Sequence, residues 1–270
     1  MITIFSLPKP FIDRDVKIIQ NNAISSWKNL GQDVETFIIG GEEGIALACQ
    51  NIGVRHIKDV RRSEFGTPFL NDAFRIAEKE SSEEVLVYSN ADIIFFKDLL
   101  EAIKKLPSDK FLAVGRRTDL DIDYPVSFEN RSEKESLRKK AEKEGSLHSP
   151  AGIDYFIFRK STINNMPPLV VGRIGWDNYM IWNAKKNNIP IIDLTKDVLA
   201  IHQNHKPAPQ NESARKTNPE ALHNIFFIEG RGNSATIEDA NYKMVNGKLV
   251  KNHLHFLPKF KRIIKSYLKI

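Results

Sequence analysis

Residues 83–96 (EEVLVYSNADIIFF) form an apolar run that predicts a buried strand, but the polar segment Ser89-Asn90-Ala91-Asp92 interrupts it. Asp92 is the leading candidate for chemistry, because a carboxylate at the end of a central strand can hold Mg²⁺ or Mn²⁺, and such an ion can bind a diphosphate. Asn90 can bind a ribose or a water molecule of the metal. The alternative is that Asn-Ala-Asp only turns the chain and Asp92 bonds a local backbone group.

Two histidines, His202 and His205, follow an apolar stretch in the string IHQNH. Imidazole is the commonest protein ligand for transition metals, and Mn²⁺ accepts a mixed set of carboxylates and histidines. The alternative is a surface loop with ordinary hydrogen-bonding histidines.

Asp177, in GRIGWDNYMIW, precedes a helical pattern. Its ordinary role is that of an N-cap, but beside a bound substrate it would be a general base toward an attacking hydroxyl.

Four further residues are candidates for substrate binding. Glu42, in GGEEG, either hydrogen-bonds a base or ribose or is an exposed loop acid. Arg116 and Arg117 suit the charge of a diphosphate, with surface ion pairing as the alternative. Asp154 begins a predicted strand and would face the acceptor.

Short β-rich runs alternate with helical patterns through the first 200 residues. Strands are predicted at 2–7, 34–41, 56–60, 84–96, 111–117, 154–160 and 189–195, and helices at 13–30, 44–53, 69–80, 98–106 and 178–188. Thr67 and Pro68 are expected to begin the helix at 69–80 as N-cap and first helical residue. This alternation predicts an α/β fold with a mostly parallel sheet covered on both faces, and such folds bind ligands at the carboxyl ends of the strands.

The net charge of +6 comes from the C-terminal end. From Asn241 onward there are eight Lys or Arg and no acidic residue; without those eight, 32 basic residues remain against 34 acidic ones, a net charge of −2. The main domain therefore lacks the basic face that nucleic-acid binding requires, and no nucleic-acid partner is expected.

Two charged segments leave alternatives open. Residues 131–144 predict either a solvated helix with i,i+4 ion pairs or a flap over the site. Residues 258–270 predict a basic amphipathic helix, which either lies on an anionic membrane surface or packs its apolar stripe on the domain.

The chain has a single cysteine, Cys49, and no evident signal peptide or membrane span. These features favour a cytoplasmic location, with peripheral attachment to a membrane through the tail as the alternative.

Phosphate-loop and dinucleotide-binding glycine motifs are absent from the sequence. Instead, the strings SLPKPF, GTPFLNDAF, NADIIF, GRRTDLDI, GIDYFIF, GRIGWDN and IHQNH resemble the nucleotide-sugar glycosyltransferases of the GT-A fold, and more closely a group of glycosyltransferase-like proteins. The resemblance covers about residues 1–205. It implies a GT-A-like, Rossmann-type domain at 1–225 and a basic extension at 226–270. It also implies transfer of a sugar from a nucleoside-diphosphate sugar, with UDP favoured, to a hydroxyl of a glycan or other acceptor.

The resemblance also implies roles for individual residues. Asp92 occupies the second aspartate of the family's Asp-x-Asp motif and would be a ligand of Mn²⁺ or Mg²⁺, and His202 or His205 would be the late metal ligand. Asp177 matches the base of inverting members, and Glu42 lies in the turn that usually holds a uridine.

Asn90 is the one departure, because it replaces the first aspartate of Asp-x-Asp. It supports a second hypothesis, a catalytically inactive protein that binds a nucleotide sugar or glycan. A third, a sugar nucleotidyltransferase, is disfavoured because FSLPKPF offers no glycine-rich activating loop after the first strand.

Overall fold

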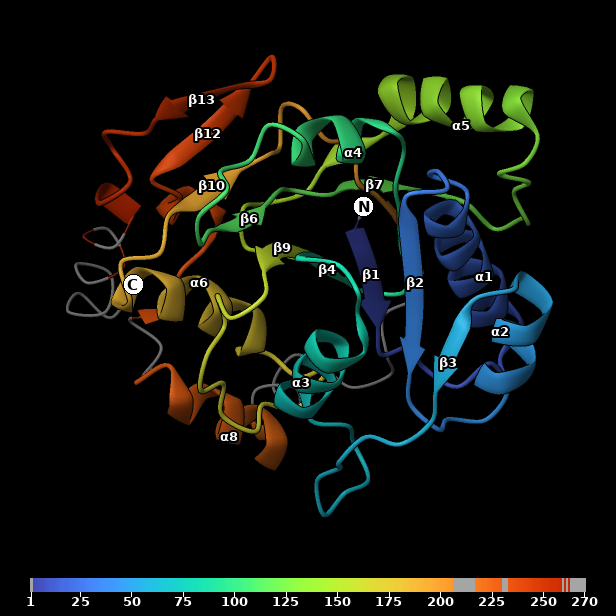
Figure 1. The fold of residues 1–270 in the computed structure, drawn as a ribbon, viewed down its shortest axis with the longest axis horizontal. Coiled ribbons are helices and arrows are strands. Elements are labelled where there is room, and N and C mark those ends of the chain that lie inside the picture. Colours follow the sequence, from blue (N-terminus) through green and yellow to red (C-terminus); the bar gives the residue numbers. More distant parts are fainter. Residues whose placement is uncertain (1, 206–216, 230–232, 259, 261, 263–270) are drawn as a thin grey trace.

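The computed structural model describes residues 2–205, 217–229, 233–258, 260 and 262. A nine-stranded sheet crosses the molecule (Figure 1) in the order β13-β12-β10-β6-β9-β4-β1-β2-β3. Its strands are β1 (Ile2–Ser6), β2 (Val34–Ile39), β3 (Arg55–Ile57), β4 (Val85–Ser89), β6 (Leu112–Val114), β9 (Tyr155–Arg159), β10 (Ile191–Asp193), β12 (Tyr242–Val245) and β13 (Lys248–Lys251).

The strands of this sheet are mostly parallel, as the alternation of strands and helices predicts. β9 is the central exception, because it pairs antiparallel with both β4 and β6; at the edge, β13 is antiparallel to β12. The amino end of β9 therefore lies beside the carboxyl ends of its neighbours, and residues just before β9 join those that follow β4.

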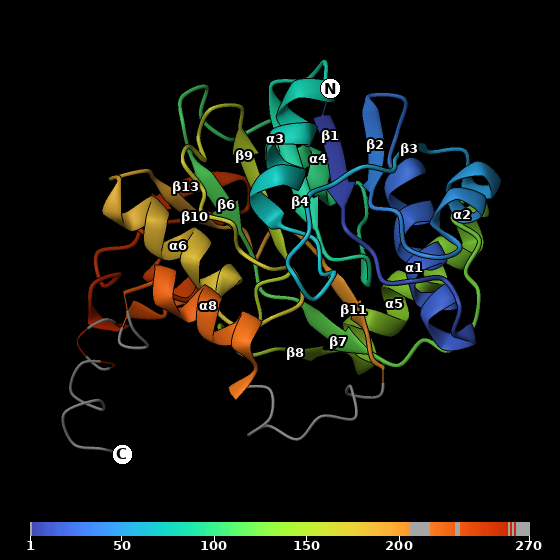
Figure 2. The ribbon, with the colours of Figure 1, turned by 90° about the horizontal axis from the view of Figure 1, so that it is seen from below.

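A second, four-stranded sheet has the order β5-β11-β7-β8. Its members are β5 (Ile93–Ile94), β7 (Thr118–Leu120), β8 (Ser146–Leu147) and β11 (Ile201–Gln203). β11 lies between β5 and β7, so it brings the late part of the chain to the segment that follows β4. Figure 2 shows β7, β8 and β11 together at one end of the large sheet.

Helices cover both faces of the large sheet (Figure 2). Their bounds are α1 (Arg14–Lys28), α2 (Ile45–Ile52), α3 (Leu70–Glu80), α4 (Asp98–Ile103), α5 (Arg131–Glu144), α6 (Trp176–Lys186) and α8 (Pro219–Phe227). A short 3-10 turn, η2, spans Ile237–Asp239. Within the described residues, no helix is long and apolar enough to span a membrane.

Side chains alternate between the two faces of the strands, as the period of two in a β-strand requires. On β4, Leu86 and Tyr88 pack with α3 and α6, whereas Val87 packs on the other face with α1, α2 and α4. The apolar run at 84–96 therefore marks a strand that is buried on both sides, which is typical of parallel sheets covered by helices.

The predicted beginning of the helix at 69–80 is wrong. α3 starts at Leu70 with Phe69 as its N-cap residue, and the Thr67 hydroxyl donates instead to Glu220 Oε2 at 3.2 Å. Pro68 forms an isolated β-bridge with Arg62, which keeps its backbone extended.

The charged segment 131–144 is a helix, α5, as predicted. Its i,i+4 pairs Arg131–Glu135 and Arg138–Glu142 are present, with N–O distances of 2.7 and 3.2 Å. Leu137 and Ala141 are buried in an apolar cluster with residues of β5, β7 and β11, so α5 is packed on the second sheet.

The predicted boundary between residues 225 and 226 falls within α8, and β12 and β13 extend the large sheet beyond it. The division at this point remains a prediction. Most of the predicted amphipathic helix at 258–270 lies outside the described residues. Of the part that is described, Arg262 donates to Asp239 Oδ1 at 2.8 Å.

Candidate functional site

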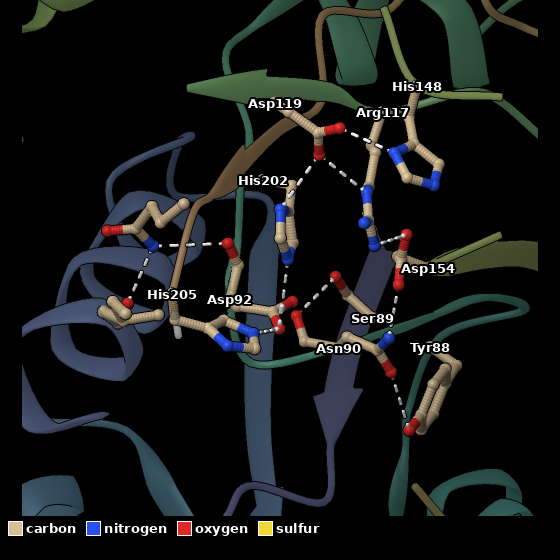
Figure 3. A network of polar contacts seen from close by, with 12 residues as sticks. Tyr88, Ser89, Asn90, Asp92, Arg117, Asp119, His148, Asp154, His202 and His205 are labelled. Atoms are coloured by element: carbon tan, nitrogen blue, oxygen red, sulfur yellow. Dashed lines mark hydrogen bonds and ion pairs between the residues drawn. The ribbon is translucent and has the colours of Figure 1, made fainter. Parts of the chain in front are cut away.

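Asp92, His202 and His205 come together where β4 leaves the large sheet (Figure 3). One ligand atom from each lies within 4.8 Å of the others. Asp92 Oδ2 is 3.7 Å from His202 Nε2 and 3.6 Å from His205 Nε2. The structure thus unites the three residues predicted as metal ligands, although about 110 positions separate Asp92 from the histidines.

Strand register explains how His202 reaches this point. On β11 it pairs with Ile93 of β5 on one side and with Asp119 of β7 on the other. The next residue, Gln203, is fully buried; its amide nitrogen donates to Ile19 O at 2.8 Å, and its backbone N–H donates to Asp92 O at 3.2 Å. Gln203 therefore fixes the segment that carries His202 and His205 against both α1 and Asp92.

The chemistry of this cluster fits a divalent metal ion. Asp92 Oδ1 is buried and has no hydrogen-bond partner among the described residues, so one carboxylate oxygen remains for a ligand. Burial opposes ionisation of Asp92, but the hydrogen bond from His205 holds its pKa below the usual value. Burial lowers the pKa of His202, which favours the neutral imidazole, the state that binds a metal.

Asp119 supports His202 from behind. Asp119 Oδ1 lies 3.0 Å from His202 Nδ1, on the side of the ring opposite the Nε2 that faces Asp92. Its Oδ2 is 2.6 Å from His148 Nδ1. Asp119 Oδ1 and His202 Nδ1 form an ion-pair contact, and His202 Nδ1 makes no hydrogen bond among the described residues. Since carboxylates beside the distal nitrogen of a histidine ligand orient its ring, Asp119 lies where it could orient His202.

Arg117 connects Asp119 to Asp154 (Figure 3). Its Nε donates to Asp119 Oδ1 at 2.9 Å and its Nη1 to Asp154 Oδ2 at 2.8 Å. Asp154 lies just before β9, which explains its place at this edge of the sheet. Burial raises the pKa of Asp154, and the Arg117 guanidinium acts in the opposite direction.

Asn90 does not face the metal cluster. Its Nδ2 donates to Asp154 Oδ1 at 2.7 Å, and its Oδ1 accepts from the Tyr88 hydroxyl at 3.3 Å. The Asn90 backbone N–H also donates to Asp154 O at 2.8 Å. The amide thus bridges β4 and β9, and the proposed metal ligand of the motif is Asp92 alone.

Asp177 lies in the first turn of α6, whose N-cap is Gly175, so the alternative that Asp177 is an N-cap is wrong. Its Oδ1 accepts from the Asn178 backbone N–H at 2.9 Å. Burial raises the pKa of Asp177 to about 6, and the nearby Asp154 carboxylate adds to the shift. A carboxylate with this pKa can take up a proton near neutral pH, as a general base must.

Glu42 lies in the turn after β2. Its Oε1 accepts from Arg62 Nη1 at 2.7 Å, whereas its Oε2 is buried and has no hydrogen-bond partner among the described residues. A glycine at position 40 allows this placement for two reasons. A Cβ there would lie 2.4 Å from Glu42 Oε2, and the backbone φ of +126° is rarely adopted by other residues. The turn therefore presents an unused acceptor.

Arg116 takes a structural position instead of pointing freely into solvent. Its Nε donates to His148 O at 2.6 Å, and its backbone N–H donates to Thr195 Oγ1 at 2.9 Å. Its predicted contact with a diphosphate remains a prediction.

The sequence prediction did not include Asp119 and His148. A usable signal existed for Asp119, since it lies two positions after Arg117 and successive odd positions of a strand share a face. His148 directly follows β8, and no pattern in the sequence indicated it.

Comparisons with known proteins identify the fold. No protein-family model matches the chain, and no curated protein sequence matches it. Among solved structures, a mannosyltransferase from Pyrobaculum calidifontis in complex with GDP-mannose and Mn²⁺ aligns at a TM-score of 0.53 and 14% identity, covering 99% of this chain and 70% of the other.

Glucosyl-3-phosphoglycerate synthase from Mycobacterium tuberculosis aligns at a TM-score of 0.51 and 11% identity, over 84% of this chain and 79% of the other. The same enzyme in complex with Mn²⁺, UDP and phosphoglyceric acid aligns at a TM-score of 0.50 and 12% identity, over 87% and 79%. These structures confirm the predicted fold: the chain has the GT-A-like α/β fold of nucleotide-sugar glycosyltransferases.

Proposed function

We propose that this protein is a metal-assisted glycosyltransferase that moves a sugar from a nucleoside-diphosphate sugar to a hydroxyl of a glycan or other acceptor. The observation that carries the proposal is the cluster of Asp92, His202 and His205 at the carboxyl end of the central strand β4. Ligands of open α/β sheets bind at this edge. Fold alone does not define chemistry. The proposal therefore depends on both the GT-A-like fold and the potential metal ligands at this edge.

The proposed ligands of Mn²⁺ or Mg²⁺ are the Asp92 carboxylate and the Nε2 atoms of His202 and His205. When bound, such an ion neutralises the charge of the leaving diphosphate. Asp119, whose Oδ1 lies 3.0 Å from His202 Nδ1, would orient this ligand. Arg117 and Asp154 form the adjoining wall of the site.

For the base of the nucleotide, we propose Glu42 Oε2 as an acceptor. Uracil carries an imide N–H that a carboxylate accepts well, so UDP is the favoured nucleotide. Thymine carries the same imide N–H, and guanine carries a ring N–H beside a carbonyl, whereas adenine and cytosine lack this donor. The unused Oε2 atom therefore favours UDP, TDP or GDP over ADP or CDP.

For the chemical step, we propose Asp177 as the base that takes the proton of the acceptor hydroxyl, with inversion at the anomeric carbon. Its pKa of about 6 leaves it ionised at neutral pH while retaining useful basicity.

Asn90 does not by itself favour the alternative of an inactive binding protein. That alternative depends on a metal site weakened by the loss of an aspartate. Because the Asn90 amide is engaged by Asp154 and Tyr88, the three-residue cluster is assembled without it.

The test is thermal unfolding with UDP, GDP, CDP, TDP and ADP, each with MnCl₂ or with EDTA. A ligand that binds only the folded state stabilises it by about 2.7 kcal/mol at a hundred times its Kd. We expect a metal-dependent rise in Tm with UDP that is lost in Asp92→Asn and kept in Asp123→Asn, a matched change at an exposed site. Release of UDP from UDP-sugars, measured on the same samples, tests turnover.

Each other outcome has a defined meaning. Binding that is equal in EDTA would overturn the metal site, and binding with no release of nucleotide from any donor would favour the inactive protein. No shift with any nucleotide would remove the proposed function. Attachment of the basic tail to anionic membranes remains a separate prediction, which a vesicle sedimentation assay on the chain truncated after residue 257 would test.

A further inference from the structure

A cavity of about 690 Å³ lies beside the carboxyl-terminal half of α6, away from the Asp92 cluster. Strand β9 separates the two places. Thr162, in the cavity wall, follows β9, whereas Asp154 precedes it; five residues of strand, about 17 Å, lie between them.

The cavity wall is rich in side-chain amides and aromatic rings, contributed by Asn164, Asn165, Asn183, Asn187, Tyr179 and Trp182. An amide both donates and accepts hydrogen bonds, as a sugar hydroxyl does. Aromatic rings offer apolar surface to the C–H face of a sugar ring. A wall with both features suits a carbohydrate.

Part of the polar capacity of this wall is unused. Asn187 Nδ2 donates to Asn183 Oδ1 at 2.9 Å, which leaves Asn187 Oδ1 and Asn183 Nδ2 outside that bond. The Thr162 side chain is 3% exposed, and its hydroxyl has no hydrogen-bond partner among the described residues. A buried polar group without a partner is unfavourable, so a hydroxyl-bearing ligand at this wall would relieve it.

The charges of the cavity favour a neutral ligand. Lys186 Nζ lies 4.6 Å from the centre of the Trp182 ring and donates to Glu229 Oε1 at 2.7 Å. This ion pair is exposed, and exposed pairs stabilise proteins little, so Lys186 can leave the Trp182 ring to a ligand at small cost. Among the described residues of the wall, Lys110 is the one other charged residue. A single lysine is a poor complement for a polyanion.

We propose that this cavity is a second, non-catalytic binding site for a neutral oligosaccharide. It holds the ligand through the amides, the Thr162 hydroxyl and the exposed part of Trp182, and it works independently of the metal cluster. The proposal does not rest on the proposed transferase activity, because its site, its ligand contacts and its readout are separate from those of the Asp92 cluster.

The test is saturation-transfer difference NMR, titrated to a Kd, with maltotriose, cellotriose, mannotriose and chitotriose as probes. We expect binding of at least one trisaccharide by the full chain without metal, equally in Asp92→Asn. Asn164→Ala, at an exposed loop position, is expected to weaken that binding five- to tenfold, because it removes hydrogen bonds to the ligand. Asn51→Ala, the same change at an exposed position of α2, is the matched control and should change nothing.

Thr162→Val gives a second, independent variant. It removes a hydroxyl that has no partner, so we expect an unchanged or higher Tm together with weaker trisaccharide binding. The proposal is overturned if no trisaccharide binds. It is also overturned if binding is lost in Asp92→Asn, which would place the sugar at the metal cluster, or if Asn164→Ala and Thr162→Val both bind like the unchanged protein.

Discussion

Asn90 Nδ2 donates a 2.7 Å hydrogen bond to Asp154 Oδ1, and this bond requires an amide at position 90. An aspartate at position 90 would face the Asp154 carboxylate with no donor between them. Like charges at such a distance repel, and Asp154 is already difficult to ionise because it is buried. Asparagine at position 90 therefore donates to Asp154 and adds no second negative charge beside it.

We expect Asn90→Asp to lower the free energy of unfolding by about 2 kcal/mol, because a hydrogen bond is lost and two carboxylates are brought together. Urea unfolding at pH 7.5 measures this. Asn51→Asp on α2 is the matched exposed control, with an expected change below about 0.5 kcal/mol. An Asn90→Asp protein of unchanged stability and tighter Mn²⁺ binding would show instead that position 90 belongs to the metal site.

Asp119→Asn tests the support of His202. The exchange keeps the size of the side chain but removes the negative charge that lies 3.0 Å from His202 Nδ1. Loss of such a supporting carboxylate typically weakens metal affinity 10- to 100-fold. We expect this loss for Mn²⁺, measured by the rise in Tm as metal is titrated.

The control for Asp119→Asn is Asp123→Asn, an exposed aspartate close by in the chain, which should leave Mn²⁺ affinity unchanged. If Asp119→Asn binds Mn²⁺ as tightly as the unchanged protein, His202 is oriented by other contacts and the role assigned to Asp119 is wrong.

Much of the fold follows from local patterns in the sequence. The apolar run of β4 and the alternation of strands and helices predicted a mostly parallel sheet, and the polar segment at 89–92 lies at the edge where Asp92, His202 and His205 meet. The antiparallel direction of β9 was not predictable in this way, because a strand buried on both faces shows the same apolar run in either direction.

The parts of the site that were missed depend on long-range register. Asp119 contacts His202 only because β7 and β11 pair in one particular alignment, which sets residues 83 positions apart side by side. The engagement of Asn90 depends likewise on the alignment of β4 with β9. Propensity and periodicity carry no information on such pairings, so sequence alone could name Asn90 and not its partner.

Glu42→Ala tests the nucleotide contact. We expect about tenfold weaker UDP binding, because the buried Oε2 acceptor is removed and Arg62 loses its ion pair with Glu42. The neighbouring Glu43→Ala is the matched control, since this side chain is exposed. Equal effects of the two changes on the Kd of UDP, measured by calorimetry, would show that the turn after β2 does not hold the base.

Asp177 predicts a pH dependence of both stability and activity. Burial raises its pKa from 3.8 in the unfolded chain to about 6 in the folded protein. The folded state therefore holds this proton more tightly, and the resulting stabilisation is complete below pH 3.8 and is lost as the pH rises to about 6. We expect Asp177→Asn to remove this fall in the free energy of unfolding. At pH 7.5 the variant should be more stable than the unchanged protein by at most about 3 kcal/mol. This figure is an upper bound, because the Asp177 side chain is only partly buried.

As the proposed base, Asp177 must be ionised, so sugar transfer should increase with pH through about 6. Asp177→Asn should lower the transfer rate 10²- to 10⁴-fold and leave the Kd for UDP with Mn²⁺ unchanged. The combination is informative, because a merely structural aspartate would not produce a more stable protein that binds its nucleotide and fails to transfer. A variant that transfers at the original rate, with the original pH profile, would assign the base to another residue.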